Sequence, residues 1–325
     1  MTIRRSGNIK RLGRSIVGTL GLGTLALTYA HFIEPRRMQA VRYDVGVANL
    51  PPSLDGFRVA HLTDFHLGAG GGNHHAAMRS IDVALADQPD LIVFTGDVAH
   101  EGYWVGGDDM LARLPAAAPT IATLGNHDWR HDEPGAKEIT ERLQSLEIKV
   151  LSNESSIVQS RSGSGQLLVV AVDDDYTGHA DFGTAMQHAE REGFGQLPAI
   201  MLTHVPDVVD ELPAGRFALT LAGHTHGGQI RFSPFKRDTP LDFPMHSADL
   251  NSQYVRGTHV MNGNPLFVGN GTGSSGMPFR FLAPPQAAIF TLRSGVDASL
   301  DPDDENRYFT LRERKDERDF AHSGE

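Results

Sequence analysis

The chain has 325 residues, a formal net charge of −11 and no cysteine. This length is enough for one large domain with a substantial hydrophobic core. The lack of cysteine excludes disulfides, thiolate metal sites and a cysteine nucleophile. Because the net charge is negative, the protein as a whole does not attract nucleic acid electrostatically, and we expect no nucleic-acid partner.

The N-terminal segment has the pattern of a membrane anchor. Basic residues between Arg4 and Arg14 precede an uncharged run, residues 15–33, which is long enough to cross a bilayer as a helix. A cleaved signal peptide and a buried soluble helix are the alternatives. Because most of the positive charges precede the run, we expect a single N-terminal transmembrane helix with the rest of the chain outside the cytoplasm.

The expected organisation has three parts. Residues 1–37 form the basic segment and membrane anchor, residues 38–300 form the main domain, and residues 301–325 form a charged, mobile tail. The sequence shows no internal repeat and no internal linker.

Short apolar runs alternate with helical patterns along the main domain. Strands are expected at residues 42–47, 56–63, 91–95, 120–124, 148–151, 156–159, 167–172, 199–203, 217–221, 266–268 and 288–292. Helices are expected at residues 74–86, 108–114, 136–146 and 184–192. This alternation predicts an α/β fold whose sheets contain parallel segments.

Polar side chains follow five of these strands at the point where each strand ends. They are Asp64 and His66, Asp97, Asn126 and His127, His204, and His224 and His226. Ligands of α/β sheets bind beyond the carboxyl ends of the strands, so we expect these side chains to converge. Residues two apart in an extended strand point to one face, which predicts that His224 and His226 aim at the same spot.

Without His127, the clusters offer two aspartates, one asparagine and four histidines. These are too many ligands for one tetrahedral ion, and they suit two ions that share a carboxylate. Asp97 stands alone at its strand end and is the natural bridge. Paired divalent ions bind the oxygens of a phosphoryl group and activate a water molecule, so the pattern predicts hydrolysis of phosphoesters.

The same residues resemble the calcineurin-like metallophosphoesterases. The chain has that family's motifs in order and spacing over roughly residues 42–292: Asp64-Phe65-His66, Gly96-Asp97, Gly125-Asn126-His127-Asp128, His204 and Gly223-His224-Thr225-His226. The fuller string through Gln229, with residues 254–257 and 276–281, resembles the membrane-anchored or exported members. The resemblance implies a two-sheet mixed β-sandwich flanked by helices.

The resemblance also implies a role for each matching residue. Asp64, His66 and His226 would bind one divalent ion, while Asn126, His204 and His224 would bind the other. Asp97 would bridge the two ions, which would be manganese, iron or zinc. A metal-bridging hydroxide would attack, and His127 would contact the phosphate and act as general acid. The expected substrate is a phosphodiester or a pyrophosphate, with a lipid-linked one among the candidates.

One departure from the family pattern keeps alternatives open. Members often carry an acidic residue three places after the bridging aspartate, where this chain has His100 followed by Glu101. This leaves open which residue orients His127. The alternatives are a phosphomonoesterase acting on phosphoproteins and a membrane-tethered protein that retains metals without turnover. Arg280 is a candidate for binding substrate phosphate. The alternative is that it pairs with an acidic residue at the surface.

Overall fold

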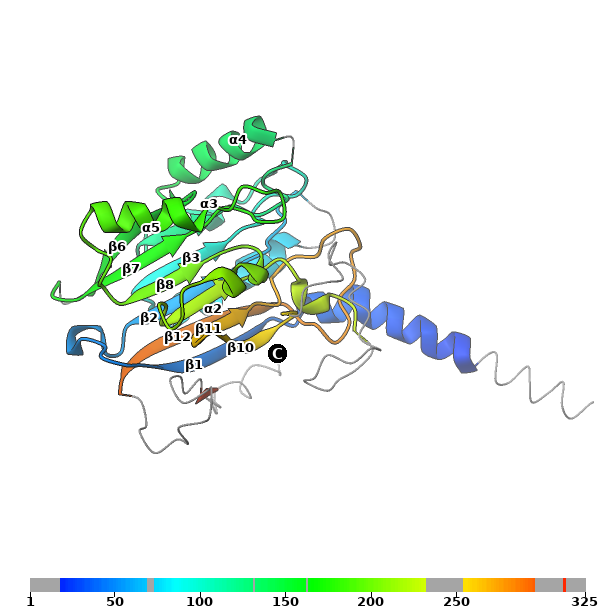
Figure 1. Ribbon diagram of the computed structural model, residues 1–325. Coiled ribbons are helices and arrows are strands. Elements are labelled where there is room, and N and C mark those ends of the chain that lie inside the picture. Colours follow the sequence, from blue (N-terminus) through cyan, green and yellow to red (C-terminus); the bar gives the residue numbers. More distant parts are fainter. Residues whose placement is uncertain are drawn as a thin grey trace, which may run out of the picture.

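The computed structural model describes residues 18–68, 73–130, 132–161, 163–231, 254–295 and 312–313. Two mixed sheets form the centre of the described chain (Figure 1). One sheet has the order β13 (Arg312–Glu313), β1 (Gln39–Val47), β12 (Gln286–Ser294), β2 (Arg58–Leu62), β3 (Leu91–Thr95), β4 (Thr120–Thr123) and β5 (Lys149–Val150). The other has the order β10 (Gly257–Met261), β11 (Asn264–Val268), β9 (Leu219–Ala222), β8 (Ala199–Leu202), β7 (Gln166–Ala171) and β6 (Glu154–Gln159). The predicted architecture of two mixed sheets with helices is confirmed.

Helices cover the outer face of each sheet. The first sheet packs against α2 (Asn73–Ala86), α3 (Asp108–Leu111) and α4 (Asp132–Ser145). The second packs against α5 (Phe182–Arg191) and the 3₁₀ helix η4 (Pro206–Glu211). A third apolar cluster fills the space between the sheets.

Strand β3 shows how the sequence produces these layers. Leu91 and Val93 belong to the cluster between the sheets, whereas Ile92 and Phe94 belong to the cluster under the helices. Successive side chains of a strand point to opposite faces, so a strand buried on both faces must be apolar throughout. The wholly apolar run at residues 91–95 therefore forms a central strand.

The C-terminal part of the domain contains a hairpin that the sequence analysis did not predict. Strand β10 pairs with β11 through Asn262 and Gly263, both of which have positive φ. An Asn-Gly pair is the preferred sequence for such a tight turn, so the signal was present in the chain. Residues 312–313 of the predicted mobile tail pair with β1, and the rest of residues 301–325 lies outside the described residues.

The predicted transmembrane helix is not found in the described residues. Residues 18–28 are α-helical and extend away from the sheets (Figure 1), and they continue into η1 (Tyr29–Ile33) and η2 (Glu34–Arg36). Within residues 18–68 and the other described ranges, no helix is both long enough and apolar enough to span a bilayer. Residues 1–17, which include the basic segment, lie outside the described residues.

Two residues at the end of the predicted span contact the domain. The carbonyl of Ala30 accepts a hydrogen bond from the Arg280 backbone N–H at 2.9 Å. The Glu34 carboxylate accepts one from the Ala283 backbone N–H at 2.7 Å. These bonds fix Ala30 and Glu34 against the loop that precedes β12, while Phe32 and Ile33 between them stay exposed.

Candidate metal centre

The predicted site residues meet where parallel strands of both sheets end. Strands β2, β3 and β4 are parallel neighbours in one sheet, and β8 and β9 are parallel neighbours in the other. The loops after these strands hold two groups of side chains. Group A is Asp64, His66 and His226, and group B is Asn126, His204 and His224. All of them are buried except Asn126, which is partly exposed.

Group A surrounds one point. His66 Nε2 lies 2.9 Å from His226 Nε2, and His226 Nε2 lies 3.6 Å from Asp64 Oδ1. Asp97 adds a carboxylate oxygen, Oδ2, at 3.4 Å from His66 Nε2. One ligand atom from each of these four residues falls within 4.8 Å of the others. Two carboxylates and two imidazoles can therefore reach a single ion.

Group B surrounds a second point. His224 Nδ1 lies 3.0 Å from Asn126 Oδ1 and 3.3 Å from His204 Nε2. His204 Nε2 in turn lies 3.3 Å from Asp97 Oδ2, the same oxygen that approaches group A. A single carboxylate oxygen is therefore shared by the two groups.

Contacts behind the ligand atoms orient the rings and the bridge. His204 Nδ1 donates to the Thr95 carbonyl at 2.8 Å, and His226 Nδ1 lies 3.3 Å from the Gly273 carbonyl. A carbonyl can only accept, so His204 Nδ1 carries a proton and Nε2 is the nitrogen that faces the site. His226 Nδ1 has both the Gly273 carbonyl and the donor Arg280 Nη2 at 3.3 Å, and its Nε2 likewise faces the site. The other oxygen of Asp97, Oδ1, accepts the backbone N–H of His127 at 2.8 Å. This bond leaves Oδ2 as the oxygen that points between the groups.

Backbone strain is concentrated at these positions. Asp64, His66, Asp97, His224 and His226 all have positive φ, between 47° and 70°. Residues other than glycine seldom adopt this conformation, and when they do the strain often marks a functional site.

The backbone conformation of His224 and His226 differs from the extended strand that was expected. His224 and His226 lie beyond the end of β9, in a turn rather than in an extended strand. Strand alternation therefore does not apply to them, and their rings enter different groups. The prediction that they aim at the same spot was wrong in this detail.

Two glycines of the motifs lie so close to the site carboxylates that no side chain would fit at their positions. A Cβ atom on Gly125 would lie 2.4 Å from Asp97 Oδ1, and one on Gly223 would lie 2.6 Å from Asp64 Oδ2. Both distances are far shorter than van der Waals contact. Glycine at these positions lets the backbone pack directly against the two carboxylates.

Burial and charge set the protonation of the centre. Burial lowers the pKa of His224 to about 3 and holds the pKa values of His66 and His226 well below the usual range, so these rings are neutral. Burial also raises the pKa of the Asp64 carboxyl to about 7. Burial disfavours ionisation of Asp97, but the neighbouring His204 and His127 rings outweigh it and hold the pKa of Asp97 well below its usual range. His204 differs from the other three rings: burial opposes its charge, but Asp97 and Asp64 outweigh burial and hold the pKa of His204 well above its usual range. Metal ions bind the neutral imidazole and the ionised carboxylate, so an ion bound here would displace the proton of His204.

The convergent nitrogen atoms of each group lie close enough to need a positive centre between them. His66 Nε2 lies 2.9 Å from His226 Nε2, and His224 Nδ1 lies 3.3 Å from His204 Nε2. The lone pairs of neutral imidazoles at these distances repel one another unless a proton or a metal ion is shared between them. Carboxylate, amide and imidazole donors suit manganese, iron and zinc. The residues therefore fit two divalent ions.

His127 lies beside the centre and contacts several groups. Its Nδ1 atom lies 3.2 Å from Glu101 Oε1, and its Nε2 atom lies 3.3 Å from Ser275 Oγ. Glu101 also forms an ion pair with Arg130 at 3.1 Å. The ring of His100 stacks on that of His127, with centroids 5.3 Å apart and an angle of 15° between the planes.

Asp128 is a residue whose role the sequence analysis missed. Its carboxylate accepts backbone N–H bonds from Ala99 at 2.8 Å, Gly125 at 3.0 Å and Val98 at 3.3 Å. These bonds join the loop that carries Asp97 to the loop that carries Asn126 and His127. The signal available in the sequence was an aspartate three residues after a turn glycine, a spacing typical of side chains that bond the backbone of a turn.

Arg280 neither faces a substrate site nor forms a surface ion pair, the two roles predicted for it. Its guanidinium is fully buried and donates to the carbonyls of Gly273, Ala283 at 2.8 Å and Asn270 at 3.0 Å. It lies behind His226, with Nη2 at 3.3 Å from His226 Nδ1. The side chain therefore holds the loop over residues 270–283 and is not exposed to a substrate phosphate.

The comparisons with known proteins agree with this geometry. The family profile described as calcineurin-like phosphoesterase matches residues 57–228, which is more than half of the chain. The chain is 26% identical to the "Uncharacterized metallophosphoesterase YkuE" of Bacillus subtilis (strain 168), and the match covers 86% of this chain and 96% of that protein.

Two further relatives have similar identities. "Phosphodiesterase YaeI" of Escherichia coli (strain K12) is 26% identical, with 76% of this chain and 85% of that protein covered. A "Transmembrane protein with metallophosphoesterase domain" of Danio rerio is 28% identical, with 85% of this chain and 61% of that protein covered. The protein therefore belongs to the calcineurin-like phosphoesterases and is a metallophosphoesterase, a hydrolase of phosphoric esters.

Proposed function

We propose that the protein hydrolyses phosphodiesters at a centre of two divalent ions. The observation that carries this proposal is the position of Asp97 Oδ2, which lies 3.4 Å from His66 Nε2 of group A and 3.3 Å from His204 Nε2 of group B. Group A would hold one ion and group B would hold the other. Asp97 would be a ligand of both ions. Two bound ions would polarise the phosphoryl group and lower the pKa of a water molecule.

His127 would donate the proton that the leaving oxygen needs. Its Nδ1 lies 3.2 Å from Glu101 Oε1, which is within ion-pair distance although the two atoms do not form a hydrogen bond. The opposite nitrogen, Nε2, would then give its proton to the leaving group. The peptide N–H of His127 bonds Asp97 Oδ1, which ties the position of the acid to that of the bridge.

Glu101 would take the orienting role that an acidic residue at position 100 has in other family members. His100 itself stacks on His127, and burial lowers the pKa of its ring, so it adds packing without a negative charge. Arg130 holds the far oxygen of Glu101 at 3.1 Å and fixes the direction of the carboxylate. This arrangement supports turnover over the alternative of a protein that only retains metals.

A diester is favoured over a monoester by the comparison with phosphodiesterase YaeI. The test is to strip the full chain with a chelator, reload it with Mn²⁺, and measure hydrolysis of bis(p-nitrophenyl) phosphate and p-nitrophenyl phosphate. We expect metal-dependent turnover with the diester preferred, and none from the matched Asp97→Asn variant. Preference for the monoester would support a phosphomonoesterase instead, and no turnover of either substrate would support metal retention alone.

A further inference from the structure

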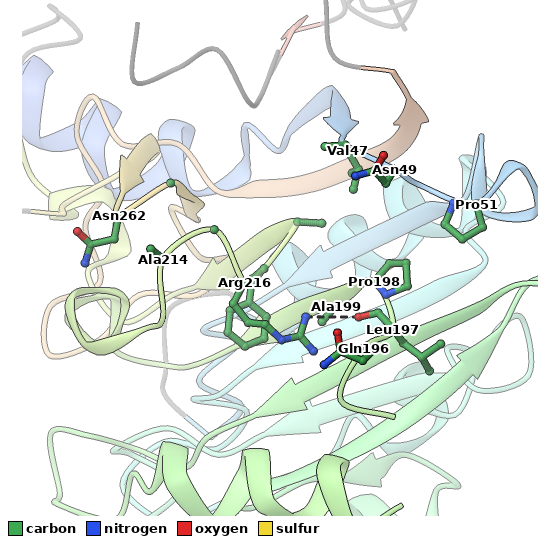
Figure 2. A pocket seen from close by; sticks show the side chains of 15 residues that line it. Val47, Asn49, Pro51, Gln196, Leu197, Pro198, Ala199, Ala214, Arg216 and Asn262 are labelled. Atoms are coloured by element: carbon green, nitrogen blue, oxygen red, sulfur yellow. Dashed lines mark hydrogen bonds between the residues drawn. The ribbon is translucent and has the colours of Figure 1, made fainter. Parts of the chain in front are cut away.

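A second concavity lies at the other end of the sandwich from the metal centre. It has a volume of about 800 Å³ and is bordered by the end of β1, the loop before β8 and the loop before β9 (Figure 2). His204 and His224 follow the carboxyl ends of β8 and β9, whereas this pocket lies at the amino ends of the same strands. The length of the strands separates the two sites by on the order of 15 Å.

The walls of the pocket are mainly apolar. Val47 and Ala218 line it and also belong to the apolar cluster between the sheets. Phe217, Ala199 and Leu197 add further apolar surface. The pocket is thus an open end of the inter-sheet core, and an aliphatic group placed here would extend that core and release water.

Arg216 is the one charged residue in this lining, which contains no acidic side chain. Its guanidinium donates to the carbonyls of Gly195 at 3.0 Å and Leu197 at 3.4 Å, and Figure 2 shows it directed toward the loop before β8. Among the residues that the structure describes, no carboxylate pairs with it. The side chain is half-buried, and burial lowers its pKa, as expected for a cation without a nearby counter-charge.

We propose that this pocket binds a small anionic amphiphile, namely a monocarboxylate with an aliphatic body of medium length. The carboxylate would accept hydrogen bonds from Arg216 and supply the counter-charge that the lining lacks. The aliphatic body would lie against Val47, Phe217 and Ala218. A neutral or cationic amphiphile of the same length would leave the guanidinium uncompensated. This site is independent of the proposed hydrolysis of phosphodiesters.

The test is isothermal titration calorimetry of the full chain with decanoate, decanol and decyltrimethylammonium, each below its aggregation concentration. We expect saturable binding of decanoate, and binding at least about tenfold weaker for the other two, because a charge-assisted hydrogen bond is lost. Arg216→Gln should weaken decanoate binding by a similar factor. The matched control is Arg191→Gln on α5, an exposed arginine outside the pocket, which should leave decanoate binding unchanged.

A second variant keeps the test decisive if Arg216→Gln unfolds. Ala214 is exposed at the mouth of the pocket, so Ala214→Trp should fill the entrance without disturbing the core and should abolish decanoate binding. Absence of decanoate binding to the unmodified chain would overturn the proposal. So would equal binding of decanoate and decanol, or undiminished binding to a folded Arg216→Gln or Ala214→Trp variant.

Discussion

His66 Nε2 lies 2.9 Å from His226 Nε2, although the two residues are 160 positions apart in the chain. The imidazole planes are nearly parallel, with an angle of 25° and centroids 4.8 Å apart. His66 follows a strand of one sheet, and His226 follows a strand of the other. Neither sheet alone contains the centre, so correct packing of the two sheets is a condition for metal binding.

Replacing the shared carboxylate should impair metal binding more than replacing any other ligand. Asp97→Asn removes the negative charge that both ions need, so we expect loss of both ions. The matched comparison is Asp64→Asn, which should lose mainly one ion. The Asp64 carboxylate approaches a ligand nitrogen of group A only, and its contact with group B is to the backbone N–H of His224 at 3.1 Å. Metal content per chain, measured by mass spectrometry after dialysis, distinguishes them. Two fully occupied ions in Asp97→Asn would refute the bridging role.

Removing the general acid should reduce turnover without removing the metals. For His127→Ala we expect nearly unchanged metal content and a rate lower by about 10²–10⁴-fold on a diester with a basic leaving group. The loss should shrink when the leaving group is p-nitrophenolate, which needs no proton. Equal losses for both kinds of leaving group would mean that His127 binds phosphate and donates no proton.

Glu101 should act only through His127. Because Glu101 contacts Nδ1 of that ring, Glu101→Gln should lower kcat by about 10–100-fold, the usual effect of a residue that orients a functional group. In the His127→Ala background the same change should have no further effect, because the group that it positions is gone. Glu141→Gln, an exposed glutamate on α4, serves as the control. Equal effects of Glu101→Gln with and without His127 would contradict the positioning role.

His61 should make the stability of the fold depend on pH. Burial lowers its pKa to about 3, compared with about 6.5 in the unfolded chain, and its Nε2 contacts Thr95 Oγ1 at 2.8 Å. The unfolded state therefore binds a proton that the folded state does not. Stability should fall as the pH decreases from about 6.5 toward 3, by up to about 1.4 kcal/mol per pH unit from this group.

Urea unfolding at pH 7, 6 and 5 tests this dependence. His61→Gln preserves a polar contact to Thr95 but cannot take up a proton, so its free energy of unfolding should depend less steeply on pH than that of the unmodified chain. Identical slopes for the two proteins would show that His61 does not contribute.

Features repeated along the chain could be predicted from the sequence. The apolar run at residues 91–95 indicates a central strand, and the polar residues after successive strands indicate a common site, because both follow from local patterns and strand geometry. The contacts of Glu101 and Asp128 could not be predicted, since they depend on where one loop lies relative to another. The apolar composition of residues 15–33 also does not reveal that Ala30 bonds the loop before β12, because this contact depends on where that loop lies.

The measurement that tests the central claim most directly is a manganese titration of the chelator-treated full chain. Bound metal per chain and hydrolysis of bis(p-nitrophenyl) phosphate are followed in the same samples. A shared Asp97 between two ligand groups predicts binding that saturates at two ions, with turnover that reaches its maximum only when the second ion is bound. Saturation at one ion with full activity, or two bound ions without hydrolysis, would contradict the account.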